Sequence, residues 1–159
     1  MRTTCLILSL LCGLTPLATL AETITCPDLG QAVQVGACPS EEELRYTYMG
    51  YCGDNARMYD ANKDDVCSTF DNYRKLKNVV LWESADGNFS GYVSCDLPPA
   101  QLKAAAPATL SVARQGSITR LICGYGAGIV FSHRTKQACR PQGDGNCAAD
   151  TAGCRAACQ

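Results

Sequence analysis

Cysteine is the residue type that most constrains this chain, because 12 of its 159 residues are cysteines. Cys5 and Cys12 lie in an apolar N-terminal segment. The other ten form an even set: Cys26, Cys38, Cys52, Cys67, Cys95, Cys123, Cys139, Cys147, Cys154 and Cys158. In an exported chain an even set predicts disulfides, each of which typically stabilises a small domain by about 2–4 kcal/mol. We therefore predict five disulfides and no catalytic thiol, although spacing alone does not give the pairing.

The first 21 residues, MRTTCLILSLLCGLTPLATLA, have the anatomy of a signal peptide. Arg2 provides the positive end, and the apolar run that follows is much shorter than the roughly 20 residues of a membrane span. The small residues Thr19 and Ala21 predict cleavage after Ala21. The mature chain would then start at Glu22, without a membrane span, and be secreted or periplasmic.

Two other uses of cysteine are less well supported. A lipid on Cys12 would need small residues before it, but Leu10 and Leu11 occupy those positions. Zinc bound by the last four cysteines, in residues 139–158, would need CxxC pairs that are absent there, and His133 is the only histidine. We predict neither a bound metal nor a cofactor.

The region from Glu22 to about Asp65 is predicted to be irregular, and its local signals conflict after Ser40. Ser40 to Glu43 has the form of a capping box, which would begin a helix at residue 41. Over residues 44–52, however, Leu and Tyr alternate with Arg, Thr and Met, and Gly50 weakens a helix. We predict a strand over Leu44–Cys52.

A helix is predicted next, from about Asp65 to Lys77. Val66, Phe70 and Tyr73 recur at helical spacing, and the acidic residues at its start suit the helix dipole.

From residue 78 onward, short apolar runs alternate with turn residues, which is typical of antiparallel strands. The predicted strands are Val79–Glu83, Phe89–Asp96, Thr109–Arg114, Ile118–Cys123 and Ile129–Arg134, with one helical turn within Gln101–Ala106. Ile118–Cys123 is apolar on both faces and is therefore predicted at the centre of the sheet. Cys139–Gln159 is predicted as a cysteine-pinned appendage.

These elements predict one α+β domain over residues 22–159. It is a small disulfide-rich domain with an antiparallel meander of four to six strands, one short helix and the C-terminal appendage.

The net charge of −1 gives no basic excess, so nucleic acid is not predicted as a partner. Charge is nevertheless uneven, with ten acids against five bases in residues 22–75 and five acids against eight bases in residues 76–159. Solvated faces explain this distribution. The sharper hypothesis is that Arg114, Arg120, Arg134 and Lys136 form a patch for an acidic partner, with Arg120 and Arg134 close across the last hairpin.

Aromatic residues gather on or beside the predicted strands: Tyr46, Tyr48, Tyr51, Trp82, Phe89 and Tyr92. If exposed together, they could form a platform for a sugar or a peptide. Packing in the core explains them more simply, and for Trp82 in particular we favour the core.

The segment from Asp60 to Asp71 partly matches a calcium-binding loop. Asp60, Asn62, Asp64 and Asp71 place oxygen ligands at the first, third, fifth and twelfth positions. The sixth position is Asp65 rather than Gly, and the twelfth is not a bidentate Glu. A solvated acidic turn is the simpler interpretation.

Catalysis has little support in the sequence. Ser132 and His133 are adjacent, but neighbouring strand residues point to opposite faces of a sheet. No GxSxG motif is present, and no two acids can be placed at the separation that glycoside cleavage requires.

The sequence favours an exported non-enzymatic module that binds a protein or a glycan. The alternatives are a secreted hydrolase or toxin that uses His133 or a carboxylate pair, and a calcium-stabilised extracellular module.

Overall fold

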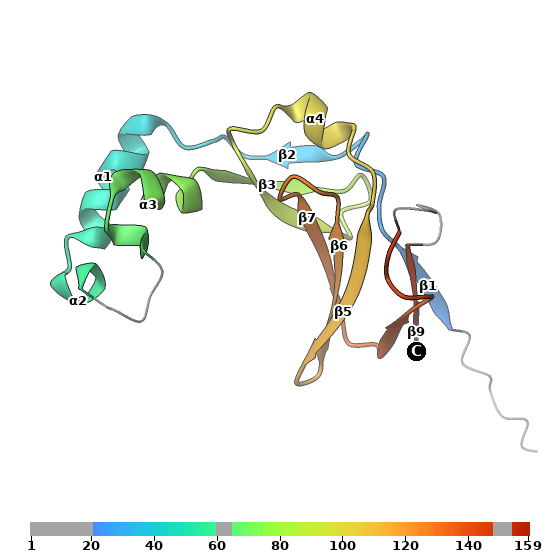
Figure 1. The fold of residues 1–159 in the computed structure, drawn as a ribbon. Helices are drawn as coiled ribbons and strands as arrows, with labels where there is room; N and C mark the ends of the chain where they lie inside the picture. The colour runs from blue at the N-terminus through green and yellow to red at the C-terminus, as the bar shows by residue number, and fades with distance from the viewer. Residues whose placement is uncertain (1–20, 60–64, 148–153) are drawn as a thin grey trace, which may run out of the picture.

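The computed structural model describes residues 21–59, 65–147 and 154–159. It has an α+β fold with two antiparallel sheets and short helices, held by five disulfides (Figure 1). In chain order the elements are β1 (Glu22–Thr25), β2 (Val33–Val35), α1 (Glu41–Cys52), α2 (Asn55–Met58), the 3₁₀ turn η1 (Asp65–Cys67), α3 (Phe70–Lys77), β3 (Val79–Glu83), β4 (Ser90–Ser94), α4 (Pro99–Lys103), β5 (Thr109–Gln115), β6 (Ile118–Gly124), β7 (Val130–Thr135), β8 (Cys139–Pro141) and β9 (Arg155–Cys158).

The larger sheet has the strand order β2-β3-β4-β7-β6-β5. The β3–β4 and β5–β6 hairpins turn at Gly87 and Gly116, whose positive φ angles of 71° and 60° suit glycine. The β3–β4 hairpin joins the β5–β6–β7 meander through a single paired position, Ser90 opposite Ser132. The centre of the sheet is therefore the β4–β7 junction. The prediction that placed β6 there is wrong, because β6 lies next to the edge strand β5.

Alternation along the strands gives this sheet one buried face and one open face. Trp82, Phe89, Leu121 and Phe131 point to the buried face and are at most 5% exposed. Leu29 and Leu102, the latter from α4, are also in this core. The opposite side has no covering layer among the described elements, and we call it the open face. It is formed by the other set of alternating residues, and its central part is Leu81, Glu83, Ser90, Tyr92, Arg120, Ile122, Val130, Ser132 and Arg134.

A second sheet joins the two ends of the described chain. Its order is β1-β9-β8, so that β9 near the C-terminus pairs with β1 as well as with β8. Cys139–Cys158 and Cys147–Cys154 close the C-terminal segment, and Cys26–Cys123 ties the N-terminal segment to β6. The C-terminal segment is cysteine-pinned as predicted, but it is also held by the beginning of the described chain.

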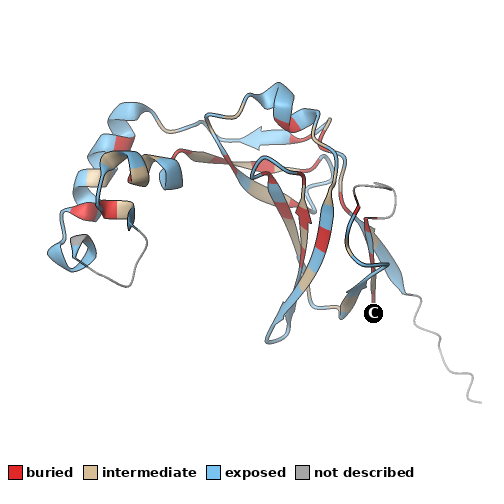
Figure 2. Cartoon of the chain, in the orientation of Figure 1, coloured by how far each residue is buried: buried red, intermediate tan, exposed pale blue. Residues whose placement is uncertain are grey.

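The helices α1, α2 and α3 with η1 form a separate unit, which we call the helical lobe (Figure 1). Its buried centre is small, namely Cys52, Cys67 and Tyr73, and it is apart from the main core (Figure 2). Cys52–Cys67 closes the lobe on itself. The Cys38–Cys95 disulfide links the segment that enters α1 to the segment that follows β4.

The predicted strand over Leu44–Cys52 is wrong, because the chain forms helix α1 there. The Ser40 side chain accepts a hydrogen bond from the Glu43 N–H, and the Glu43 carboxylate accepts one from the Ser40 N–H at 2.7 Å. Two otherwise unpaired donors of the first turn are satisfied in this way, and the alternation of apolar residues is too weak to compete. The next predicted helix is confirmed over α3, although residues 65–67 form η1 instead.

Candidate binding face

The open face combines apolar and cationic side chains in an ordered grid. Residues that are opposite one another in neighbouring strands point to the same side of a sheet. Val35, Leu81, Tyr92 and Val130 therefore form one row across β2, β3, β4 and β7, with Leu81 paired to Val35 and to Tyr92. We call it the apolar row. The Tyr92 side chain is 69% exposed and Val130 is 39% exposed.

Arg120 and Arg134 lie directly opposite one another in the β6–β7 ladder. Two like charges at opposed positions destabilise a sheet. Within the described parts of the chain, neither guanidinium forms an ion pair or a hydrogen bond to a carboxylate. The fold therefore holds two uncompensated cations together on one surface. Arg134 is four residues from Val130, which places the arginine pair about 13 Å from the apolar row at the usual rise of a strand.

Two depressions flank the arginine pair. One, of about 290 Å³, includes Leu81, Tyr92 and Val130, and the other, of about 470 Å³, includes Ile118 and Ile122. Both also include Arg120 and Arg134. The first depression lies where β4 and β7 share only one paired position. The open face is thus hollowed on both sides of the arginine pair.

The other members of the predicted basic patch contribute less. Arg114 is opposite Thr119 in the β5–β6 ladder, and Thr119 is buried. The Arg114 side chain therefore leaves the backbone on the side opposite the open face. Its Nε donates to the Gly116 carbonyl at 3.3 Å, and it borders the larger depression at the β5–β6 turn. Lys136 is exposed just beyond β7.

The aromatic residues do not form one platform. Trp82 and Phe89 are in the main core, which removes Trp82 from the binding candidates. Tyr48 packs in the lobe, with its ring 5.6 Å from that of Phe70. Tyr92 is on the open face, and the remaining two tyrosines are on α1.

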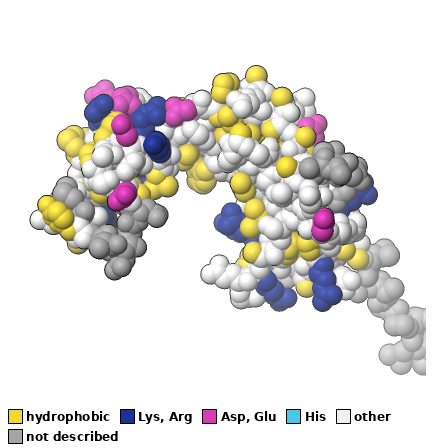
Figure 3. Space-filling view, in the orientation of Figure 1, with side chains coloured by type: hydrophobic (Ala, Val, Ile, Leu, Met, Phe, Trp, Pro, Cys, Tyr) yellow, Lys and Arg dark blue, Asp and Glu magenta, His cyan; other side chains and the backbone are white. Residues whose placement is uncertain are grey.

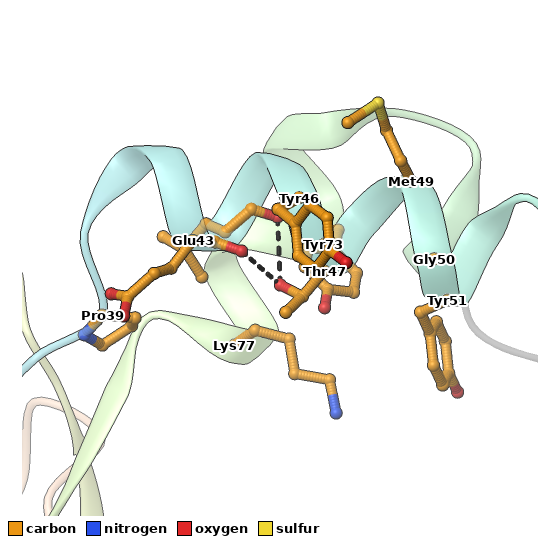
Figure 4. A pocket seen from close by; sticks show the side chains of 10 residues that line it. Pro39, Glu43, Tyr46, Thr47, Met49, Gly50, Tyr51, Tyr73 and Lys77 are labelled. Atoms are coloured by element: carbon orange, nitrogen blue, oxygen red, sulfur yellow. Dashed lines mark hydrogen bonds between the residues drawn. The ribbon is translucent and has the colours of Figure 1, made fainter.

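A groove of about 800 Å³ lies along α1, and sequence analysis missed it because that segment was interpreted as a strand. Figure 4 shows the side chains of Tyr46, Met49 and Tyr51 projecting from α1, with Lys77 of α3 nearby. Tyr46 is 75% exposed and Met49 is 66% exposed. Gly50 lies in the helix interior, and an added Cβ would have no neighbour within 4 Å.

His133 lines a separate depression of about 360 Å³ together with Glu22 and Asp86. Its Nδ1 is 2.8 Å from the Asn88 carbonyl oxygen, so Nδ1 carries a proton and Nε2 is the free ring nitrogen in the neutral form. Asp86 is engaged elsewhere, because the hydroxyl of Ser84 and the side-chain amide of Asn88 hydrogen-bond to it and hold its pKa below the ordinary value. Among the described residues no hydroxyl is hydrogen-bonded to His133, so no nucleophile, base and acid are linked there.

The calcium prediction falls largely outside the described residues, since Asp60, Asn62 and Asp64 are not among them. Asp71 is exposed in the first turn of α3. In the described part of the chain no cluster of three or more His, Cys, Asp or Glu side chains is placed to hold a metal ion. Across the same residues, no helix combines the length and apolar character needed to cross a membrane.

Comparison with models of known protein families, with curated protein sequences and with solved protein structures finds no match.

Proposed function

We propose that this protein is an exported, non-enzymatic binding module that captures an acidic protein partner on its open face. In this proposal the first 21 residues are removed, and the mature chain from Glu22 acts in the periplasm, at the cell envelope or outside the cell. Five disulfides among ten cysteines are consistent with an oxidising compartment.

The observation that carries the proposal is the arginine pair. Arg120 and Arg134 are held side by side on a sheet face without a carboxylate partner, which costs stability unless a ligand supplies the opposite charge. Guanidinium groups bind carboxylates with two parallel hydrogen bonds, so an aspartate or glutamate side chain is the chemistry that fits best.

A protein partner suits this face better than a glycan or a small molecule. The apolar row and Ile122 would be covered by aliphatic or aromatic side chains, which an acidic polysaccharide does not provide. Both depressions include the arginine pair, so a protein surface can engage the two together, whereas a small molecule would fill only one of them.

Poly-L-glutamate is a direct probe of this proposal. We expect the oxidised chain from Glu22 to Gln159 to bind immobilised poly-L-glutamate at 20 mM NaCl and to lose most of that binding at 300 mM NaCl. Arg120→Gln with Arg134→Gln should weaken the binding at least tenfold. In the matched control, Arg140→Gln with Arg155→Gln, the same charge is removed from β8 and β9, and we expect less than a twofold change.

Equal losses in the two double variants would show non-specific attraction and overturn the proposal, as would an absence of binding by the unmodified chain. Mass spectrometry of the exported protein checks the processing step. The proposed start at Glu22 is wrong if the mature N-terminus lies elsewhere.

A further inference from the structure

A surface that complements the open face lies on the same chain, along helix α1. Glu42, Tyr46 and Met49 are spaced i, i+4 and i+7, so they form one stripe on the helix. All three are exposed, with Tyr46 at 75% and Met49 at 66%. The stripe thus presents a carboxylate at one end and two large apolar side chains at the other.

Glu42 differs from the two acids beside it. Glu41 is paired with Arg45 at 3.0 Å and with Arg74 at 3.3 Å. Glu43 completes the capping box at Ser40, and these hydrogen bonds hold its pKa below the ordinary value. Glu42 has no ion pair or hydrogen bond to any described residue. It is therefore the carboxylate of the first turn that remains free for an external cation.

We infer that α1 of one copy docks on the open face of a second copy, with Glu42 between Arg120 and Arg134 and with Tyr46 and Met49 on the apolar row. The inference rests on the proposed function, because it names a second copy as a partner for that same site. Glu42 and Met49 are about 10.5 Å apart along the helix axis. The arginine pair and the apolar row are about 13 Å apart along the strands, and the long side chains on both surfaces span the difference.

Charge distribution and backbone shape support the same pairing. Most acidic side chains visible in Figure 3 lie over the helical lobe, where basic ones lie among them, whereas the lower part of the sheet carries mainly basic ones. Gly50 lies one turn beyond Tyr46 on α1, in the groove and without a steric reason for glycine. A helix-interior glycine costs roughly 1 kcal/mol relative to alanine, and here it leaves the backbone open to close approach.

Such a contact joins two different surfaces, so it is heterologous and extends into chains or rings of molecules. Helix α1 is only about 18 Å long, so the interface is smaller than the roughly 800 Å² per partner of a stable complex. Association is therefore expected to be weak, concentration-dependent and sensitive to salt.

Sedimentation velocity of the oxidised chain from Glu22 to Gln159, between 10 and 500 µM, tests the inference. We expect the weight-average sedimentation coefficient to rise with concentration at 20 mM NaCl and to rise much less at 300 mM NaCl. Glu42→Arg alone, or Arg134→Glu alone, should abolish the rise. Combining both changes on one chain restores opposite charges across the contact and should recover association. Asp71→Arg, with the same charge change elsewhere on the lobe, should leave it intact.

Gly50→Ala provides a readout that is separate from folding. The added methyl group should weaken association at least threefold while the melting temperature stays equal or rises. Four results would overturn the inference: a monomer at every concentration, association that persists in Glu42→Arg, no rescue by the paired change, or an equal loss in Asp71→Arg.

Failure of the inference and failure of the proposed function give different results. If the chain stays monomeric but binds poly-L-glutamate through Arg120 and Arg134, only the second copy is the wrong partner. If neither self-association nor that binding is seen, the open face is not a binding surface and both proposals fail.

Discussion

The helical lobe and the sheet are stabilised in different ways although they share one chain. The large sheet packs its buried face against α4, the N-terminal segment and the second sheet, and the resulting core includes Phe131, Leu121 and Trp82. The lobe has a much smaller centre of Cys52, Cys67 and Tyr73, and among its other described side chains only Leu44 is buried. Burial of apolar surface is therefore the main source of stability in the sheet, whereas the lobe depends on a disulfide, a capping box and exposed ion pairs.

This difference matters for the proposed function, because both proposed surfaces consist of side chains that lie outside the buried core. The open face is the uncovered side of the sheet, and α1 is the outer helix of the weaker unit. Arg120, Arg134, Glu42 and Tyr46 can therefore be changed without removing core packing. The predictions below test the division between the two units, from the largest expected effect to the smallest.

The largest effect should come from the sheet core. Phe131 is fully buried, and Phe131→Ala should lower the free energy of unfolding by about 3–5 kcal/mol. Urea unfolding followed by fluorescence is suitable, because Trp82 is the single tryptophan and lies in the same core. The control is Tyr92→Ala on the open face, for which we expect a change within about 0.5 kcal/mol. Similar losses in the two variants would contradict the assignment of buried and open faces.

A smaller, local effect is expected in the lobe. Cys52 and Cys67 are 15 residues apart, and closing a loop of that length stabilises by about 3 kcal/mol in the chain-entropy model. Replacing both with alanine should speed hydrogen exchange in α1 and α3, whereas exchange in β6 should be unchanged. The urea transition reported by Trp82 should also stay in place. If β6 exchanged faster to the same extent, the two units would unfold together and the comparison would be wrong.

Much of the sheet could be predicted from the sequence, because its signals are local. The strand over Val79–Glu83 is confirmed at both ends, and the turns at Gly87 and Gly116 lie in the gaps between the predicted strands. The five disulfides are predicted by the even number of cysteines after residue 21, together with the expectation that the chain is exported. The closeness of Arg120 and Arg134 across the β6–β7 hairpin could also be predicted, but their direct opposition depends on the register, which the sequence leaves open.

The candidate site as a whole could not be predicted, because it depends on long-range packing. Which face of the sheet stays open is decided by β1, β9 and α4, which are distant in sequence. The α1 surface was missed for a different reason. Two local patterns disagreed at residues 44–52, and the capping box at Ser40 and Glu43 outweighed the alternation of Leu44, Tyr46 and Tyr48.

The smallest predicted effect concerns the junction between the two units. Arg74 of α3 donates two hydrogen bonds of 2.9 Å to the carboxylate of Asp96, which follows β4, and Asn78 donates a third at 3.0 Å. The hydrogen bonds from Arg74, followed by its charge, hold the pKa of Asp96 below its ordinary value of 3.8. A carboxyl group with a lowered pKa in the folded state stabilises the fold above that ordinary value. The stabilisation is lost as the pH falls through the lower, folded pKa.

Thermal unfolding of the unmodified chain and of Asp96→Asn isolates this contribution. Other acids with a lowered pKa, such as Glu43 and Asp86, are present in both proteins, so their effect on the melting temperature cancels in the difference. The unmodified chain should have the higher melting temperature at pH 6, and the gap should narrow as the pH is lowered towards 2. Because the pair is exposed, the gap should also shrink at 300 mM NaCl. A gap that is constant across pH and salt would mean that Asp96 acts through its shape and not its charge, and that the lobe is joined to the sheet by the Cys38–Cys95 disulfide and packing alone.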